Sequence, residues 1–497
     1  MDRIIIYVTE HNSVNFTKEL ISRLKVKDPN TRISLISYRN VFVKNLLKIL
    51  PEDSIDNIVI QGNTKLVNND YGLSFDEKLE IKRIESTYSK TTIWEYIFQD
   101  RKLVYKMLGL EYSTKMSSFN DNTKKLTILK RFIKIEELFT QFKPTKIIYL
   151  TQDFGTSIST IAFEVAKHRD VQIFIPIISK FYQRFGITDD IYGSWNKLKK
   201  TYDALINSDL SNKAKIELDK YILNKKPIVF HKNNKKTFLA FHLFKKIRTF
   251  LKIFYHQIFL VNDENTITIR SKLISNFVSL FRKFNYILVS KKMLSNIPAD
   301  SFIYFPLHVE PELVLLTQSQ QYLNQIEIIN QLARSLPNDC SLLVKDHPAS
   351  YGRRSYRFYI SLLKIPNVKV VKNKVNSVEL ISKSVAVATI NGSAGLEAYL
   401  LSKKVFTLSK PYYHFLNNIY KLSDPALYSR EIKEKINHQD TSTDINNQLF
   451  FVEALFRNTT EINLLELITK YETEQENEKM KIQFEEYFQF LVSHFNE

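Results

Sequence analysis

Cysteine is almost absent from this chain, because Cys340 is the only cysteine among 497 residues. A single thiol excludes an intramolecular disulfide and a metal cage made of thiolates, and it fits a reducing cytoplasm. Long apolar runs are missing too: no stretch reaches about 18 uncharged apolar residues, so we expect no membrane span. The start of the chain, with the apolar run Ile4–Val8, reads as a buried strand and lacks the cationic segment of a signal peptide.

Glycine and proline are scarce as well, with nine and 13 residues respectively. This scarcity argues against a collagen-like chain and against a disordered one. The hydrophobic share of 44% and the charged share of 25% are typical of a folded and soluble protein. A chain of this length exceeds one ordinary hydrophobic core, so we expect two or three domains.

Acidic residues are outnumbered by basic ones, and the formal net charge is +19. Such a charge predicts an anionic partner: nucleic acid, anionic lipid, or a phosphorylated or acidic substrate. The imbalance is local, because no Asp or Glu occurs between Tyr221 and Asn262, whereas the stretch from Tyr471 onwards is rich in glutamate. The pattern therefore favours a basic surface patch.

Two series of alternating strand and helix patterns predict an α/β fold with parallel sheets and helices on both sheet faces. The clearest unit is 146–176, which contains a strand, a loop, a helix and a second strand. The expected strands, rich in β-branched residues, are Ile4–Val8, Ile33–Ile36, Ile58–Ile60, Lys146–Leu150, Val171–Ile175, Phe302–Phe305, Ser341–Val344, Val368–Val371, Val385–Ile390 and Val405–Leu408. We predict Rossmann-like domains at 1–190 and 301–445, a helical basic segment at 191–300 between them, and C-terminal helices at 446–497.

Two of the nine glycines lie in one turn between a predicted strand and a predicted helix. Gly392 and Gly395 let backbone N–H groups, including that of Ala394, approach an anion that the helix N-terminus stabilises. Ser393 is a natural N-cap, and its hydroxyl also reaches a phosphate. The turn therefore predicts a phosphate-binding element.

A second strand ends in Lys345-Asp346-His347-Pro348. Lys345 and His347 lie on one side of an extended segment because strand side chains alternate, and Pro348 restricts His347 to extended geometry. At the end of a strand this histidine donates to a phosphate oxygen or protonates a leaving group, unless it merely caps a loop. Together with the glycine turn, the segment predicts one phosphate-bearing pocket.

The first strand of the second series ends in a run with two prolines and three ionisable groups. We expect His308 and Glu310 to contact a ligand, and Glu312 less so, because ligand-facing loops occur at the carboxyl edge of such sheets. A solvated turn is the alternative.

Other carboxylates allow two interpretations each. Asp153 follows a strand and either faces the cleft as a general base or nucleophile or caps the next helix. Glu397, one turn into its helix, either accepts from ribose hydroxyls or complements the helix dipole. Asp100 and Arg101 follow an aromatic helical stretch and are interpreted as a buried or cleft-facing ion pair.

Several catalytic signatures are missing. The chain has no DxD, no HExxH and no Cys/His ligand spacing, so we expect no metal. The absence of GxGxxG, GxxxxGK[ST] and GxSxG counts against a dinucleotide enzyme, a P-loop NTPase and an α/β-hydrolase.

The segment Phe238–Val261 predicts a basic amphipathic helix, with Lys245, Lys246, Arg248 and Lys252 between apolar residues at helical spacing. Such a helix lies on an anionic membrane surface, or it packs on its own domain with a solvated basic face. The one-sided charge slightly favours the membrane.

These elements resemble, in chain order, the bacterial capsule polysaccharide biosynthesis family, which contains the Kdo transferases that build capsule linkers. The resemblance rests on Asp100-Arg101, the loop Asp153–Gly155, Phe305–Glu312, Lys345–Pro348 and Gly392–Ala398. It is most specific over residues 300–415. The resemblance implies a GT-B-like glycosyltransferase whose two Rossmann-like domains face each other across a cleft, with the nucleotide-sugar donor in the C-terminal domain and the acceptor in the N-terminal one.

The resemblance also implies site roles. His347 and Ser393 with its neighbouring amides would hold the donor phosphate. The catalytic residues that we predict are His347 and Asp153, the latter from its place after a strand, since the loop at Asp153 lacks the glutamate expected in many relatives. Members that use CMP-linked sugars need no divalent metal, because a histidine and a helix dipole stabilise the departing monophosphate. No cofactor is then expected, and a lipid-linked or glycan acceptor places the enzyme at the inner face of the plasma membrane.

Two other functions stay open. A teichoic-acid-type CDP-glycerol glycerophosphotransferase also uses a His-Pro pair and a CMP leaving group. A nucleic-acid-binding protein would use the basic stretch 221–262, but no recognition module is present, so a nucleic-acid partner is not expected.

Overall fold

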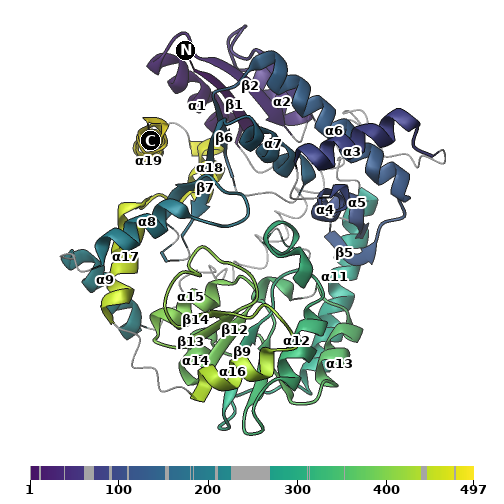
Figure 1. The fold of residues 1–497 in the computed structure, drawn as a ribbon, viewed down its shortest axis with the longest axis vertical. Helices are drawn as coiled ribbons and strands as arrows, with labels where there is room; N and C mark the ends of the chain where they lie inside the picture. The colour runs from purple at the N-terminus through teal and green to yellow at the C-terminus, as the bar shows by residue number, and fades with distance from the viewer. Residues whose placement is uncertain are drawn as a thin grey trace, which may run out of the picture.

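The computed structural model shows two α/β domains, each built around its own β-sheet (Figure 1). The structure describes residues 2–9, 13–37, 40–60, 72–88, 92–108, 111–151, 156–179, 181–182, 184–206, 211–224, 269–310, 312, 314–351, 353–437, 445–474 and 477–496. Two Rossmann-like domains, as the sequence predicts, are therefore present.

The N-terminal domain contains a seven-stranded sheet in the order β15-β8-β7-β6-β1-β2-β3. Its strands are β1 (Arg3–Val8), β2 (Arg32–Ser37), β3 (Asn57–Ile60), β6 (Lys146–Tyr149), β7 (Gln172–Ile178), β8 (Phe185–Thr188) and β15 (Thr459–Thr460). The strands from β3 to β7 are parallel, and β8 and β15 are antiparallel to their neighbours. β1 is buried on both faces, since Ile4 and Ile5 belong to different core clusters, as is usual for a parallel sheet covered by helices.

The C-terminal domain contains a six-stranded and wholly parallel sheet in the order β11-β10-β9-β12-β13-β14. Its strands are β9 (Phe302–Pro306), β10 (Ser341–Lys345), β11 (Val368–Val371), β12 (Ala386–Thr389), β13 (Lys404–Thr407) and β14 (Ile419–Lys421). Numbered along the chain, this is the 3-2-1-4-5-6 order of a Rossmann fold. Successive residues of β9 pack on opposite faces, Tyr304 on one and Phe305 on the other.

Helices cover both faces of the N-terminal sheet, and several begin at side-chain caps. They are α1 (Val14–Lys27), α2 (Asn40–Leu47), α3 (Phe75–Thr87), α4 (Ile93–Gln99), α5 (Arg101–Val104), α6 (Asp121–Phe142) and α7 (Ser157–His168). The Ser13 hydroxyl accepts from the Phe16 N–H at the start of α1, and Asn120 accepts from Thr123 at the start of α6. A hairpin of β4 (Tyr105–Leu108) and β5 (Glu111–Met116) follows α5.

The C-terminal sheet is covered in the same way. Its helices are α12 (Gln325–Arg334), α13 (Tyr356–Leu363), α14 (Ser377–Lys383), α15 (Ser393–Leu400) and α16 (Tyr428–Asn437), with short turns η1 (Val314–Gln318), η2 (Gln320–Tyr322) and η3 (Pro348–Ser350). α14 and α15 cover the face that carries Tyr304, through Leu380 and Leu396. α12, α13 and α16 cover the opposite face, through Ile328 and Ile432 among others.

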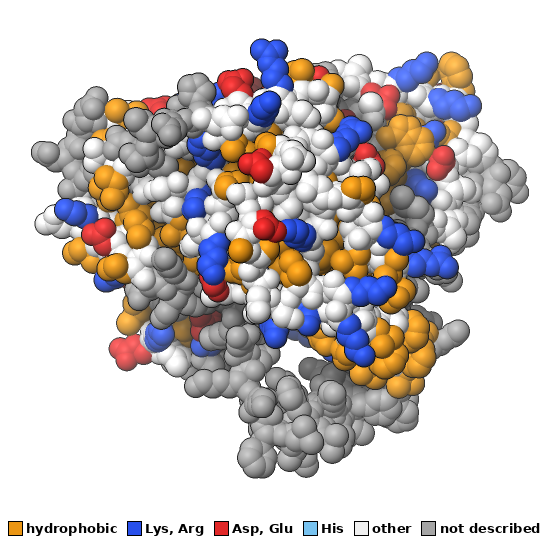
Figure 2. Space-filling model, turned by 90° about the horizontal axis from the view of Figure 1, so that it is seen from below, with side chains coloured by type: hydrophobic (Ala, Val, Ile, Leu, Met, Phe, Trp, Pro, Cys, Tyr) orange, Lys and Arg blue, Asp and Glu red, His pale blue; other side chains and the backbone are white. Residues whose placement is uncertain are grey.

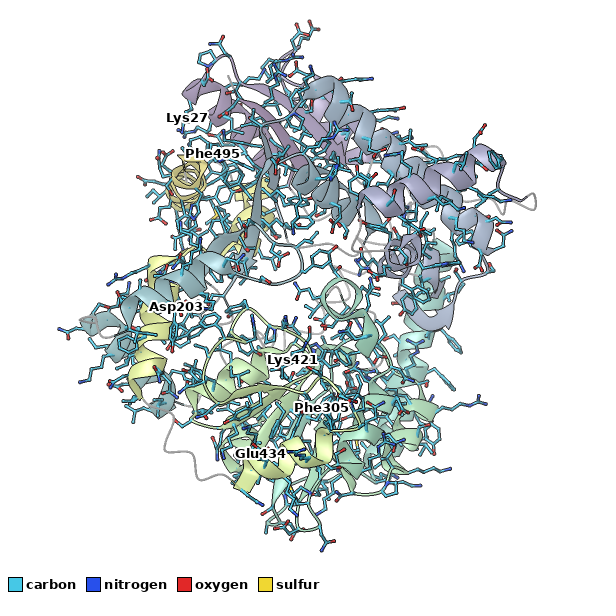
Figure 3. All side chains as sticks on the ribbon, in the orientation of Figure 1. Lys27, Asp203, Phe305, Lys421, Glu434 and Phe495 are labelled. Carbon is cyan, nitrogen blue, oxygen red and sulfur yellow. The ribbon has the colours of Figure 1, made fainter. Side chains whose placement is uncertain are left out.

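The other described helices lie between the two sheets in the sequence or after the second one. They are α8 (Asn196–Leu205), α9 (Asn212–Asn224), α11 (Ile269–Ser290), α17 (Ile445–Arg457), α18 (Leu464–Glu474) and α19 (Glu478–Ser493), followed by η4 (His494–Asn496). α17 packs against α8 and α9, after which the chain returns to the N-terminal domain. There the Lys27 ammonium lies 5.7 Å from the centroid of the Phe495 ring (Figure 3). The C-terminal helices therefore complete the N-terminal core.

All ten strands expected from the sequence are present, each within a few residues of its expected bounds. The sequence missed β4, β5, β8, β14 and β15, of which all but β5 have only two to four residues. Within the described part of the chain, no helix has both the length and the apolar character needed to cross a membrane. Phe238–Val261 lies outside the described residues, so its membrane contact stays a prediction.

Candidate functional site

The strand order of the C-terminal sheet reverses between β9 and β12, its two central strands. Open α/β sheets bind ligands beyond the carboxyl ends of the strands at such a switch point. The segment 307–312 follows β9 and the segment 390–395 follows β12. β10, which leads into His347, pairs with the other side of β9. The three segments predicted to bind a donor therefore end at one sheet edge, with the β9 loop in the middle.

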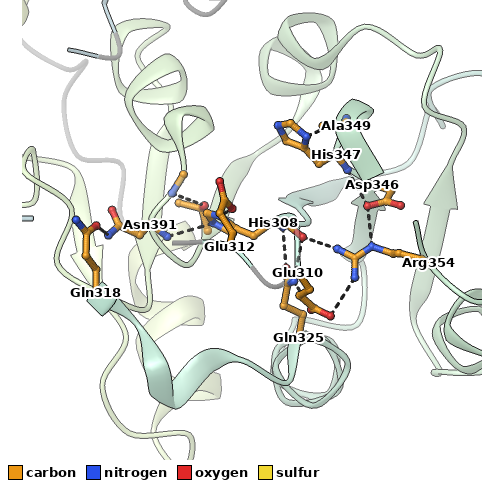
Figure 4. A network of polar contacts seen from close by, with 12 residues as sticks. His308, Glu310, Glu312, Gln318, Gln325, Asp346, His347, Ala349, Arg354 and Asn391 are labelled. Carbon is orange, nitrogen blue, oxygen red and sulfur yellow. Dashed lines mark hydrogen bonds and ion pairs between the residues drawn. The ribbon is translucent and has the colours of Figure 1, made fainter. Parts of the chain in front are cut away.

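His308 connects the loop after β9 to the loop after β12 (Figure 4). Its Nε2 accepts from the backbone N–H of Asn391 at 3.4 Å, and its Nδ1 lies 3.3 Å from Glu312 Oε2. These contacts fit the neutral tautomer that carries its proton on Nδ1 and donates it to the carboxylate. The buried ring of His308, a predicted donor ligand, thus has two partners within the protein and shapes the turn.

Two buried side chains, Gln325 and Arg354, hold the backbone of the β9 loop. Gln325 accepts from the His308 N–H at 2.8 Å and donates to the His308 carbonyl at 3.1 Å. Arg354 donates to the same carbonyl, lies 3.3 Å from Glu310 Oε2, and donates through Nε to Asp346 Oδ1 at 3.0 Å. Glu310, another predicted donor ligand, is therefore part of an internal ion pair.

His347 is held by the residue before it. Asp346 Oδ1 accepts from the His347 backbone N–H at 2.8 Å, and Asp346 Oδ2 accepts from the Tyr359 hydroxyl at 2.6 Å. His347 Nδ1 accepts from the Ala349 N–H at 3.1 Å, so the histidine does cap the loop at η3. Because Nδ1 accepts, a neutral ring carries its proton on Nε2. That tautomer is a donor suited to a phosphate oxygen.

α15 begins at Ser393 with Gly392 as its N-cap residue, so the prediction that Ser393 caps this helix is wrong by one position. The reason is that the Thr389 hydroxyl accepts from the Gly392 N–H at 3.1 Å and turns the chain one residue earlier. The turn is also crowded: a Cβ on Gly392 would lie 2.8 Å from Thr389 Oγ1, and one on Gly395 would lie 2.5 Å from Tyr413 Oη. Both glycines are therefore required by close packing.

The first turn of α15 places Ser393 and Ala394, both half-buried, at its N-terminal end. Backbone N–H groups at this end have no partner within the helix, and the helix dipole is positive there. The N–H of Gly392 itself donates to Thr389, so Ser393 and Ala394 are the residues whose N–H groups would meet an anion, and anion binding here stays a prediction.

Lys345 and Glu397, also predicted donor ligands, are buried. Lys345 Nζ donates to Ser377 Oγ at 2.7 Å, at the start of α14. Burial lowers the pKa of Lys345 to about 8, although the nearby charge of Glu397 acts to raise it. Both side chains thus face the interior beneath α14 and α15, and their contact with a donor stays a prediction.

Gln318 joins this site to the N-terminal domain. Its Oε1 accepts from Asn391 Nδ2 at 2.8 Å, and its Nε2 donates to the carbonyl of Ile191 at 3.4 Å. Gln320 likewise donates to the carbonyl of Glu95 at 3.1 Å. The loop after β9 therefore bridges the two domains.

Asp100 is fully buried and forms its ion pair with Arg131, so the predicted pair with Arg101 is wrong. The Arg131 Nη1 lies 2.6 Å from Asp100 Oδ2, and the Ser157 N–H donates to the same oxygen at 3.1 Å. Burial by itself raises the pKa of Asp100, but the guanidinium and this N–H outweigh it and hold the pKa below its usual range. Asp153, in the loop before Ser157, lies outside the described residues, and its catalytic role stays a prediction.

A cavity of about 1220 Å³ lies elsewhere, between the end of α7, the start of β7 and the segment that leads into α8. Glu164, Asp190 and Trp195 are among its lining residues, and no predicted site residue lines it. We place the candidate site at the switch point instead, because the strand topology brings together there the segments that the sequence predicts to bind phosphate. In the described ranges, no group of three or more His, Cys, Asp or Glu side chains could hold a metal ion.

Sequence reasoning missed three residues that hold the site together: Gln318, Gln325 and Arg354. Their partners are distant in the chain, so no local pattern marks them. Asp346 did carry a signal, because a residue between Lys345 and His347 in an extended segment must point to the opposite face.

Comparison with known proteins gives a family match over the C-terminal domain. Residues 291–418 match the family described as "Capsule polysaccharide biosynthesis protein", a range that contains all three segments of the candidate site. Protein FixF of Sinorhizobium fredii is 29% identical over 133 residues, which cover 25% of this chain and 31% of FixF. The chain thus matches less than a third of the length of this relative.

Solved structures with a similar fold include two sugar-handling enzymes. The β-Kdo 2,4 transferase of Thermosulfurimonas dismutans KpsC is 12% identical with a TM-score of 0.33, over 64% of this chain and 85% of that chain. UDP-GlcNAc 2-epimerase from Methanocaldococcus jannaschii is 10% identical with a TM-score of 0.26, over 92% of this chain and 99% of that chain. The family match over residues 291–418 is therefore the finding that bears on identity.

Proposed function

Because residues 291–418 belong to the capsule polysaccharide biosynthesis family, we propose that this chain is a glycosyltransferase of surface polysaccharide synthesis. It transfers a sugar from a nucleotide donor, in this proposal a CMP-linked one, to a glycan or lipid-linked acceptor. The observation that supports this most is the switch point, where a histidine whose Nδ1 accepts from the Ala349 N–H and a glycine-containing helix start share one sheet edge.

In the proposed reaction, the donor phosphate lies between His347 and the first turn of α15. His347 Nε2 donates to a phosphate oxygen, and the N–H groups of Ser393 and Ala394 stabilise the negative charge that develops as CMP leaves. Asp153 is the proposed base that takes the proton of the acceptor hydroxyl. We expect activity to be unchanged in excess chelator, because a monophosphate leaving group needs no divalent metal in this proposal.

Nucleotide binding tests the proposal directly. A ligand that binds only the folded state raises the midpoint of thermal unfolding, and we expect CMP to do so more than UDP or GDP. Replacing His347 by Ala removes a hydrogen bond to a charged group worth about 1.5–3 kcal/mol. The Kd of CMP should therefore rise about tenfold to a hundredfold. The midpoint of the free protein should fall only slightly, through loss of the cap on the Ala349 N–H. The matched control is His168→Ala, an exposed histidine at the end of α7.

Other results would redirect or end the proposal. Turnover of CDP-glycerol instead of CMP-sugars would identify a glycerophosphotransferase, which releases the same nucleotide. Wild-type CMP affinity and turnover in His347→Ala would remove His347 from the site, and no stabilisation by any nucleotide would contradict the function itself. Asp153→Asn should keep CMP binding and lose sugar transfer.

A further inference from the structure

Helix α11 exposes a second apolar face. Tyr286, Val289 and Met293, at its end and just beyond, belong to the core of the C-terminal domain. Other apolar side chains of the same helix are open to solvent, with exposed fractions of 71% for Phe277 and 59% for Phe281. Among the side chains of α11 that the structure describes, the large apolar ones exposed to solvent are Leu273, Ile274, Phe277, Leu280, Phe281, Phe284, Ile287 and Leu288. Their spacing of three and four residues places them along one side of the helix.

The stretches of chain beside this face are mainly basic, although Asp300 pairs with Lys369 of β11 at 2.8 Å. No Asp or Glu lies between Glu264 and Asp300, which covers all of α11, or between Asp346 and Glu379, which covers α13 and β11. α11 packs against α13, and Leu294, just beyond α11, pairs with Val371 of β11. Among the described side chains of these two stretches, the exposed cations are Lys291, Lys292, Arg353, Arg357, Lys364 and Lys374. Large exposed apolar patches of this kind mark interaction surfaces.

From this combination we propose that α11 docks the protein on an anionic membrane surface, with its apolar side chains in the lipid interface and the nearby cations against the headgroups. Figure 2 shows hydrophobic side chains gathered at the lower right, the side on which α11 lies in Figure 1, with Lys and Arg side chains next to them. The docking extends the proposed function, since it brings the enzyme to a lipid-linked acceptor.

Charge and apolar character together favour an anionic membrane over a second copy of this chain or a nucleic acid as the partner of α11. A second copy of this chain would bring two basic surfaces together, and like charges across an interface are unfavourable. Nucleic acid would match the charge but would leave the exposed phenylalanines and leucines in water. An anionic bilayer offers both an apolar layer and negative headgroups.

Vesicle flotation without donor or acceptor tests the docking separately from catalysis. We expect wild type to float with phosphatidylglycerol–phosphatidylcholine vesicles at low salt, more weakly at high salt, and not with phosphatidylcholine alone. The variant Phe277→Asn/Phe281→Asn/Phe284→Asn should lower the partition coefficient at least tenfold. Phe75→Asn is the matched control, because Phe75 is 74% exposed on α3 in the other domain.

A charge variant separates headgroup contact from apolar contact. Each cation near an anionic surface contributes a factor of about five, so Lys291→Gln/Lys292→Gln should weaken binding about 25-fold. Lys78→Gln/Lys82→Gln, two exposed lysines of α3, should leave binding unchanged.

The docking is overturned if wild type ignores phosphatidylglycerol vesicles at low salt, or if the triple variant floats like wild type. It is equally overturned if the triple variant loses several degrees in its unfolding midpoint, since the face would then be covered by protein, or if wild type is a dimer that this variant dissociates. If wild type binds vesicles but no nucleotide, only the proposed function is contradicted. Activity on a soluble acceptor should be unchanged in the α11 variants.

Discussion

At the scale of single residues, the alternation of side chains along and just beyond β10 places Lys345 and Asp346 on opposite faces of the sheet. Lys345 points to the face covered by α14 and α15, while Asp346 points to the face of α13 and holds Tyr359 and Arg354. The period of two, read from the sequence, places Lys345 and His347 on one side. This period does not predict that helices bury Lys345 while His347, on the same side, stays half-exposed.

Lys345→Met should flatten the dependence of stability on pH above pH 8. The folded-state pKa of Lys345 is lowered to about 8 from 10.5, mainly by burial. Between these values the unfolded chain binds more protons, so wild-type stability rises with pH there; below pH 8 the lysine is protonated in both states and adds no slope. Between pH 7.5 and 10.5, the free energy of unfolding measured with urea should rise by on the order of 3 kcal/mol more in wild type than in the variant.

The control for Lys345 is Lys383→Met, an exposed lysine on α14. It should follow the wild-type pH profile. Parallel profiles of wild type and Lys345→Met would show that this lysine titrates as it does in the unfolded chain.

At the scale of elements, one buried carboxylate joins three helices. Asp100 accepts from the N–H groups of Lys102 and Leu103 at the start of α5, pairs with Arg131 on α6, and accepts from Ser157 at the start of α7. The start of α5, the middle of α6 and the start of α7 are thereby fixed to one another.

Asp100→Asn should destabilise the protein by about 3–5 kcal/mol, because it leaves the buried Arg131 guanidinium without its counter-charge. Denaturant unfolding measures this cost. The double variant Asp100→Asn/Arg131→Met removes both charges, and it should cost less than the sum of the single variants. A loss below about 1 kcal/mol for Asp100→Asn would show that the pair is not a central support.

At the scale of the whole molecule, helices near the two ends of the sequence pack together in the N-terminal domain. After crossing to the C-terminal domain it returns through α17, and α19 packs on the first helix: the Phe16 and Phe484 ring centroids are 5.1 Å apart. Arg184 on the loop before β8 also lies 2.8 Å from Glu461. Residues from the two ends of the sequence therefore share one core.

Phe484→Ala should cost about 3–5 kcal/mol, since Phe484 is 1% exposed and its removal leaves a cavity against α1. Ile482→Ala, on the exposed side of the same helix, should stay within about 0.5 kcal/mol. Limited proteolysis should place the first new cleavages of Phe484→Ala in the N-terminal domain. Equal stability of the two variants would mean that α19 does not belong to this core.

The sequence by itself determined the type and order of the main elements, the sheet edge that carries the candidate site, and the glycine turn that precedes α15. These follow from local patterns: β-branched runs, helical spacing, and glycines between a strand and a helix. The errors there are small, such as the cap at Gly392 instead of Ser393, where the Thr389 hydroxyl turns the chain one residue early.

Only the tertiary structure decided which side chains meet. His308 and Asn391 are 83 residues apart, Asp100 bonds Arg131 instead of its neighbour, and Phe16 packs on Phe484. Such partners depend on strand order and on which helix covers which face of a sheet. The local periodicity of the sequence predicts neither. The same holds for α11, whose spacing marks it as a helix with apolar faces on both sides; the packing of Tyr286 and Val289 decides which face stays open to solvent.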